Sequence, residues 1–154
     1  MHPRPGRARS ANSVGPVDPT APSEHDDDSV DQAAVRSLNR RFYAAFEGRD
    51  LDVMSDVWEH SDRVACTHPG WRTLHGWGAV SGSWFALFGG PQHLSFILTN
   101  EVVVVAGDSA WVTVDENLIN AEGSATVAAL NLFLRHEGRW RLVAHHGSPV
   151  APQP

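Results

Sequence analysis

Apolar residues recur at two different spacings along the chain, and the change falls near His93. Before that point the spacing is helical, as in Val35, Leu38, Phe42 and Phe46, and it predicts a helix over 29–47. A Ser-x-x-Gln capping box begins this segment and a glycine follows it. Similar patterns predict two more helices, over about 51–58 and 76–88, and a short strand at 63–67 between them.

After residue 93 the apolar pattern becomes that of β-strands. Four runs, at 93–106, 110–120, 125–135 and 139–146, are separated by short glycine-containing turns, which predicts an antiparallel sheet. Several strands are apolar on both faces, for example Val102–Val105 and Leu130–Leu134, so both faces of the sheet have to be covered. The helices can cover one face. We therefore expect a homodimer in which a second copy of the chain covers the outer sheet face.

The two ends of the chain differ in composition from the middle. Residues 1–28 hold five of the ten prolines and few apolar side chains, too few to offset the conformational entropy of an ordered backbone. We expect a disordered tail over 1–28, one folded domain over 29–150 and a flexible end over 151–154.

Composition also limits the partners. A formal net charge of -6 argues against a nucleic acid partner. The single cysteine excludes an intramolecular disulfide and a multi-cysteine metal site. No apolar run approaches the roughly 20 residues that a membrane span requires, and no apolar segment of a secretory signal follows the N-terminal arginines. We expect a cytoplasmic protein without a membrane partner.

Candidate chemistry concentrates between Trp58 and Trp84, which hold four of the six tryptophans, three of the nine histidines and the only cysteine. Aromatic walls around one titratable group are typical of a pocket for a small apolar molecule. In such a pocket a neutral His68 could exchange a proton near pH 7, and burial would lower its pKa. The alternative is a histidine that only hydrogen-bonds a neighbouring loop. The predicted pocket walls are Phe42, Cys66, Trp71, Trp84, Trp111 and Asn131.

Glu116 is a second candidate because it continues the alternating apolar positions of Ala110–Val114 and shares their face. If that face lines the pocket, Glu116 is a buried carboxyl group with a raised pKa or a partner. Asn131 and His146 are the expected partners. A hydrogen-bond network with a structural role only is the alternative interpretation.

Cys66 and His68 allow two other interpretations. A nucleophilic pair needs sulfur and nitrogen within hydrogen-bond reach, whereas residues i and i+2 on a strand lie roughly 6–7 Å apart at their Cα atoms. A buried, inert cysteine is favoured. A metal site would combine both residues with His60 and a terminal histidine, but the spacings match no short zinc motif. We expect no metal and no cofactor.

Four groups of residues point to a known family. They are Arg41-Phe42-Tyr43-Ala44-Ala45-Phe46 with Asp50-Leu51-Asp52, His68-Pro69-Gly70, Gly76-Trp77 with Ser83-Trp84, and Gly138-Arg139-Trp140 with His145-His146-Gly147-Ser148. With the predicted element order, they make residues 30–150 resemble the nuclear transport factor two-like fold, most of all its SnoaL-like branch of polyketide cyclases and dehydratase-like proteins. The chain also resembles the association domain of calmodulin-dependent kinase II.

The resemblance implies an α+β fold, in which a cone-shaped, curved antiparallel sheet and three N-terminal helices surround a pocket. Similarity to the kinase association domain implies that His146 points inward and that His145 faces the dimer contact or solvent. Ketosteroid isomerases, another branch, carry a tyrosine on the first helix where this chain has Phe42. Tyr43 is one residue away, which is about 100° around a helix, so the hydroxyl donor is expected to be lost. Their catalytic aspartate corresponds to His68.

Two classes of function follow. The first is cofactor-free proton transfer of the cyclase, dehydratase or isomerase type on a small apolar molecule, with His68 as the acid or base and with Glu116 and His146 assisting. The second is a non-catalytic module that binds a ligand or assembles as a dimer. A fold of this kind does not decide between them, because one fold serves many functions.

Overall fold

The computed structural model describes residues 24–120 and 123–151. Three helices and six strands follow in the order α1 Glu24–Gly48, α2 Leu51–Val57, β1 Ala65–Thr67, β2 Leu74–His75, α3 Trp77–Gly89, β3 Ser95–Ala106, β4 Ser109–Asn120, β5 Gly123–His136 and β6 Arg139–Pro149. The strands form one sheet in the order β2-β1-β6-β5-β4-β3. The predicted α+β class with a curved sheet is confirmed.

Three details differ from the prediction. The sheet is mixed, because β1 pairs with β6 in parallel, and the two-residue strand β2 was not expected. Helix α1 begins at Glu24, five residues before the predicted start. The tail predicted for 1–28 therefore falls mainly on residues 1–23, which lie outside the described residues, as do 152–154.

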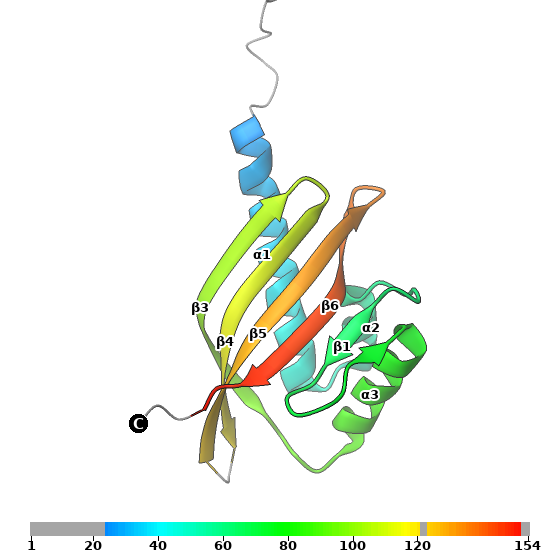
Figure 1. Cartoon of the computed structure of the whole chain (residues 1–154), viewed down its shortest axis with the longest axis vertical. Helices are drawn as coiled ribbons and strands as arrows, with labels where there is room; N and C mark the ends of the chain where they lie inside the picture. Colours follow the sequence, from blue (N-terminus) through cyan, green and yellow to red (C-terminus); the bar gives the residue numbers. More distant parts are fainter. Residues whose placement is uncertain (1–23, 121–122, 152–154) are drawn as a thin grey trace, which may run out of the picture.

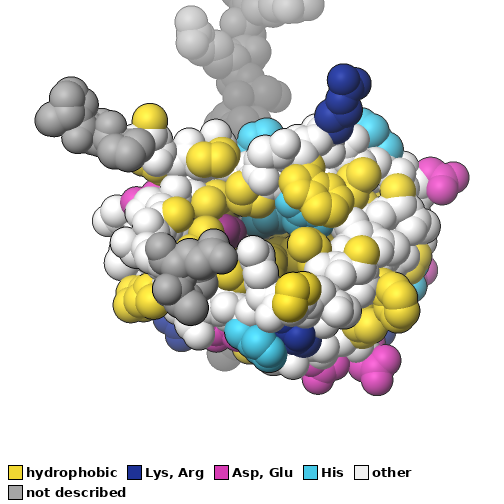
Figure 2. Space-filling view, turned by 90° about the horizontal axis from the view of Figure 1, so that it is seen from below, with side chains coloured by type: hydrophobic (Ala, Val, Ile, Leu, Met, Phe, Trp, Pro, Cys, Tyr) yellow, Lys and Arg dark blue, Asp and Glu magenta, His cyan; other side chains and the backbone are white. Residues whose placement is uncertain are grey.

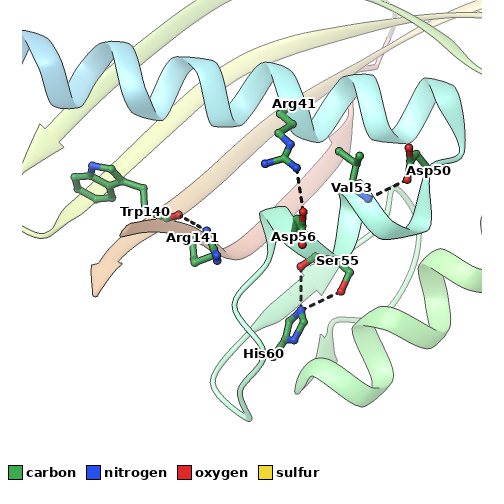
Figure 3. A network of polar contacts seen from close by, with 8 residues as sticks. All are labelled: Arg41, Asp50, Val53, Ser55, Asp56, His60, Trp140 and Arg141. Atoms are coloured by element: carbon green, nitrogen blue, oxygen red, sulfur yellow. Dashed lines mark hydrogen bonds and ion pairs between the residues drawn. The ribbon is translucent and has the colours of Figure 1, made fainter. Parts of the chain in front are cut away.

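The long helix α1 lies along one face of the four long strands, and α2 and α3 lie beside β1 and β2 (Figure 1). Asp50 caps α2, because its side-chain Oδ1 accepts a hydrogen bond of 2.9 Å from the backbone N–H of Val53 (Figure 3). Phe42 of α1 is fully buried and meets Trp84 of α3 at 5.6 Å between ring centroids. Burial of an aromatic side chain of this size stabilises the fold by about 1.5–3 kcal/mol. The core thus lies between α1, the sheet and α3.

A β-bulge in β6 decides which of its side chains point inward. Leu132 of β5 pairs with Ala144, but Phe133 pairs with Leu142, so Val143 is an extra residue. One extra residue exchanges the two faces of the strand beyond it. As a result His145 is buried and His146 is exposed. The expectation that His146 points inward is therefore wrong.

The outer face of the sheet is apolar and open. Val102 and Leu130 on this face are 55% and 45% exposed. Trp111 also belongs to this face, because the alternate positions Ala110 and Val112 are fully buried on the other side of β4. The prediction that Trp111 lines the pocket is wrong for this reason. In the described ranges, no helix combines the length and apolar character needed to cross a membrane.

Candidate functional site

The inner face of the sheet carries a buried polar cluster, which we call the inner network. Its members come from α1, β4, β5 and β6: Asn39, Tyr43, Glu116, Asn131 and His145. Each exposes 4% of its surface or less. Buried polar groups are costly unless they are hydrogen-bonded, so the pairing of each member determines what the cluster can do.

Asn131 lies at the centre of the inner network. Its Nδ2 donates to Asn39 Oδ1 at 2.8 Å and to the Tyr43 hydroxyl oxygen at 3.2 Å. Its Oδ1 is 2.6 Å from His145 Nδ1. An amide oxygen can only accept, so His145 donates from a protonated Nδ1 and keeps a lone pair on Nε2. The expected partnership of Asn131 with Glu116 is indirect and passes through the Tyr43 hydroxyl.

Tyr43 and Glu116 form a second short contact of the network. The Tyr43 hydroxyl donates to Glu116 Oε1 at 2.7 Å. Burial raises the pKa of Glu116 to about 7, although the bond from Tyr43 opposes the rise. Burial and the charge of Glu116 raise the pKa of Tyr43 well above its usual value. The tyrosine therefore keeps its proton while the carboxyl group gains or loses one near neutral pH.

The expected loss of a helix-one hydroxyl is wrong. Phe42 and Tyr43 are both buried, because α1 packs against α2 on one side and against the sheet on the other. Phe42 faces Trp84, and Tyr43 reaches Glu116 on β4. A helix covered on two sides buries an arc wide enough for two consecutive residues. The sequence comparison assumed that only one face of the helix is buried, and therefore placed Tyr43 outside the site.

His68 follows β1, the strand that pairs with β6 at His145. Its Nε2 is 2.9 Å from Ser83 Oγ, and the Ser83 hydroxyl is 2.7 Å from the Val80 carbonyl. The serine has one proton and gives it to the carbonyl, so His68 donates from Nε2 and carries a lone pair on Nδ1. Burial lowers the pKa of His68 to about 4, so the imidazole is neutral at pH 7.

The turn after His68 packs closely against β6. A Cβ on Gly147 would lie 3.1 Å from Pro69 Cγ and 3.1 Å from Val127 Cγ1. Glycine at this position therefore permits the backbone of β6 to approach the turn. The His68 ring meets Trp84 at 4.7 Å and Trp71 at 5.0 Å between centroids, both edge to face. These contacts fix the orientation of the imidazole.

Cys66 is fully buried beside His68, with its sulfur 3.9 and 4.0 Å from the two ring nitrogens. Burial and, second, the charge of Glu116 raise the pKa of the thiol to about 12. A thiol with this pKa is not a nucleophile at neutral pH, which supports the interpretation of an inert cysteine. The influence of Glu116 also places the carboxyl group and Cys66 in one electrostatic environment.

The two buried histidines, His68 and His145, also lie in one electrostatic environment. Burial, with smaller contributions from the charges of His68 and His146, lowers the pKa of His145 to about 3. The Phe42 ring lies 5.1 Å from the His145 ring. Seen from the lower end of Figure 1, the molecule has a hollow with a largely hydrophobic rim, inside which histidine and acidic side chains are visible (Figure 2). The hollow supplies an apolar entrance to a polar interior.

Most of the predicted site residues come together in this interior. They are Phe42, Cys66, His68, Trp84, Glu116 and Asn131. Trp71 is 47% exposed and lies at the edge, next to His68. Four contributors were missed or rejected: Asn39, Tyr43, Ser83 and His145. Asn39 precedes Tyr43 by four residues, one helical turn, and this polar pair within an apolar face is a signal that could have identified both.

The metal alternative required His60 to join Cys66 and His68. Instead, His60 Nε2 lies 2.9 Å from the Ser55 carbonyl oxygen, and its ring stacks on Trp77 at 4.3 Å. Across residues 24–120 and 123–151, no three His, Cys, Asp or Glu side chains are grouped as metal ligands would be.

The fold and this interior define a protein of the nuclear transport factor two-like class. Residues 35–152 match the SnoaL-like domain family, and the chain belongs to that family. Among curated proteins it is 33% identical over 115 residues to the F-box protein SKIP8 of Arabidopsis thaliana. The match covers 75% of this chain and 49% of that protein, so the chain spans about half the length of this relative.

Two solved structures are similar in both sequence and fold. A candidate dehydratase of the NTF2-like family from Streptomyces avermitilis is 34% identical, with a TM-score of 0.74 over 80% of this chain and 99% of that chain. A candidate calcium/calmodulin-dependent protein kinase type II association domain from Thiobacillus denitrificans is 36% identical, with a TM-score of 0.69 over 75% and 94%.

Proposed function

We propose that the interior of the cone binds a small, largely apolar molecule and transfers a proton on it without a cofactor. The observation that carries the proposal is Glu116, a carboxyl group with a pKa of about 7, hydrogen-bonded to Tyr43 inside a buried interior. A group that is half ionised at working pH suits general acid–base chemistry, because it can accept a proton and return it.

The other polar residues receive defined roles in this proposal. Tyr43 orients the carboxyl group of Glu116 through the 2.7 Å hydrogen bond. Neutral His68 offers the lone pair of Nδ1 as a hydrogen-bond acceptor or as a second base. The aromatic side chains of Trp84 and Phe42 exclude water and hold the apolar part of the ligand. His146 is exposed and has no role in this proposal. The buried histidine of the inner network is His145.

Similarity to a candidate dehydratase supports this reaction type. Removal of water next to a carbonyl group begins with the loss of a proton from carbon, which needs a base in a site that excludes water. The inner network places a carboxyl group in such an environment.

The reaction type can be tested with an apolar ketone that has acidic α-protons, such as 2-tetralone. Proton NMR in D2O would follow the exchange of its α-protons for deuterium. We expect the wild-type protein to accelerate the exchange and Glu116→Gln to remove about 99% of the acceleration, the lower end of the range for loss of a general base. Asp115→Asn is the matched control, because Asp115 precedes Glu116 on the strand and hydrogen-bonds to Asn100 in an exposed position. Equal rates for wild type and Glu116→Gln would refute the mechanism.

A second candidate function is subunit assembly. The apolar outer face of the sheet, with Val102 and Leu130 half exposed, favours it. The 36% identity to a candidate kinase association domain agrees with this role. The two functions use opposite faces of the sheet and are compatible. Light scattering tests assembly directly, and a monomer at micromolar concentration would exclude it.

A further inference from the structure

A second concave site lies outside the interior of the cone. Two segments meet there: the loop between α2 and β1, and the hairpin between β5 and β6. They enclose a hollow of about 520 Å³, which we call the arginine hollow. The lining side chains that can carry charge are Glu59, His60, Arg63, His136, Glu137, Arg139 and Arg141.

One arginine of the hollow is already neutralised. Arg63 Nε and Nη2 donate to the two carboxylate oxygens of Glu59, each at 2.7 Å. These bonds lower the pKa of Glu59 to about 2. The two residues thus form a bidentate ion pair that adds little net charge to the hollow.

The other two arginines have no carboxylate partner among the described residues. Arg141 donates only to the carbonyl of Trp140, at 3.3 Å. Arg139 is exposed, and its side chain makes no hydrogen bond or ion pair within the described part of the chain. The nearby carboxylate of Asp56 is bound by Arg41 at 3.1 Å (Figure 3). Glu137 also lines the hollow, and its carboxylate lies 3.8 Å from His136 Nε2 and pairs with neither arginine. Three arginines and two glutamates therefore leave the hollow with a small net positive charge.

Electrostatics agree with this geometry. Burial and then the like charge of Arg139 lower the pKa of Arg141, with Arg41 contributing in the same direction and Asp56 opposing it. A cation held near other cations gains stability when an anion arrives. This local excess is hidden in the composition, because the whole chain has a net charge of -6.

We propose that the arginine hollow is a binding site for the phosphate or carboxylate group of a small anionic molecule, held by Arg139 and Arg141. Guanidinium groups bind these oxyanions with paired N–H donors in a fixed plane. A smaller hollow of about 180 Å³ adjoins the first and shares Glu59, His60 and Arg141 with it. Its wall includes Trp58.

The proposal is independent of the chemistry in the cone, because none of the inner-network residues lines either hollow. Isothermal titration calorimetry with inorganic phosphate and, separately, with succinate tests it in the full-length protein at constant ionic strength. We expect saturable binding of at least one probe. The probe with the higher affinity identifies which oxyanion the site prefers.

Three variants make the test specific. Loss of one charge-assisted hydrogen-bonding group should weaken binding about tenfold or more in Arg139→Gln and in Arg141→Gln. Arg139 is exposed, so its variant should fold normally. Arg72→Gln is the matched control, since Arg72 is an exposed arginine that does not line the hollow, and it should bind like wild type. Absence of binding by both probes, or equal affinity in all three variants, would overturn the proposal.

Discussion

Leu130 and Asn131 are neighbours on β5, and they reverse the usual arrangement of a sheet. Asn131 is fully buried on the inner face, whereas Leu130 is 45% exposed on the outer face. Polar residues inside and apolar residues outside each reduce the stability of an isolated chain. This reversal supports the proposal that the inner face binds a small molecule and the outer face binds another subunit.

The largest effect is expected from disruption of the inner face. Asn131→Ala removes one donor group and one acceptor and leaves Asn39, Tyr43 and His145 without this partner. Unsatisfied buried polar groups cost 1–3 kcal/mol each, so we expect a loss of about 4 kcal/mol in the free energy of unfolding. Urea denaturation measures it.

Asn117→Ala is the matched control for this variant. Asn117 also donates two hydrogen bonds from its amide, to the Ile97 carbonyl and to Thr99, and both are exposed. Its Oδ1 accepts a third bond, from the Thr126 hydroxyl, which is only partly buried. Water replaces such partners, and we expect a loss below about 1 kcal/mol. Similar losses in the two variants would contradict the importance of the inner network.

The second prediction concerns pH. Burial raises the pKa of Glu116 from 4.5 to about 7, so the folded protein holds this proton more tightly than the unfolded chain. The resulting stability is complete below pH 4.5 and is lost as the pH rises through 7, by about 3 kcal/mol in total. His68 and His145 act in the opposite direction, because burial lowers their pKa values to about 4 and about 3.

Glu116→Gln separates these contributions, because it keeps both histidines. The stability of the variant relative to wild type should rise by about 3 kcal/mol between pH 4.5 and pH 8, the linkage energy of the missing carboxyl group. Urea denaturation of both proteins at a series of pH values gives this difference. If the difference did not change with pH, the carboxyl group would have an ordinary pKa.

The third prediction tests the outer face. Leu130→Glu places a charge in the centre of the exposed apolar surface without entering the core. If two copies meet there, burial of an unpaired charge should weaken association by about a hundredfold, or roughly 3 kcal/mol. Light scattering over a range of concentrations measures this, and an unchanged oligomer would place the subunit contact elsewhere.

The smallest effect is expected at Cys66. Its thiol is fully buried and has a pKa of about 12, so a disulfide reagent should label it only when the protein opens. Cys66→Ala should cost only about 1 kcal/mol, typical of a modest change in packing. Rapid labelling of the native protein would show that the interior is open at this point.

Apart from the two-residue strand β2, the sequence was sufficient for the element order and for the burial of His68 and Glu116, because hydrophobic periodicity carries that information. It was insufficient for His145. The alternation of side chains along a strand predicts the inward face only if no residue is inserted. The extra residue at Val143 exchanges the two faces of β6 beyond it. A bulge of this kind has no clear signal in the sequence, since neither glycine nor proline marks it.

Tyr43 shows a different limit. Its position on α1 was clear, but the comparison with ketosteroid isomerases placed the hydroxyl outside the site. Only the packing of α1 between α2 and the sheet makes room for both Phe42 and Tyr43. The arginine hollow was likewise hidden, because Arg139 and Arg141 on β6 meet the loop around Glu59 only in the fold.

The titration of Glu116 tests the central claim most directly. Carbon-13 NMR of the glutamate side-chain carboxyl groups, with Glu116→Gln to assign the resonance, follows its protonation from pH 4 to pH 9. We predict a midpoint near pH 7, set by burial of the carboxyl group beside Tyr43. A midpoint near 4.5, the ordinary value for glutamate, would contradict the assignment of the cone interior as an acid–base site.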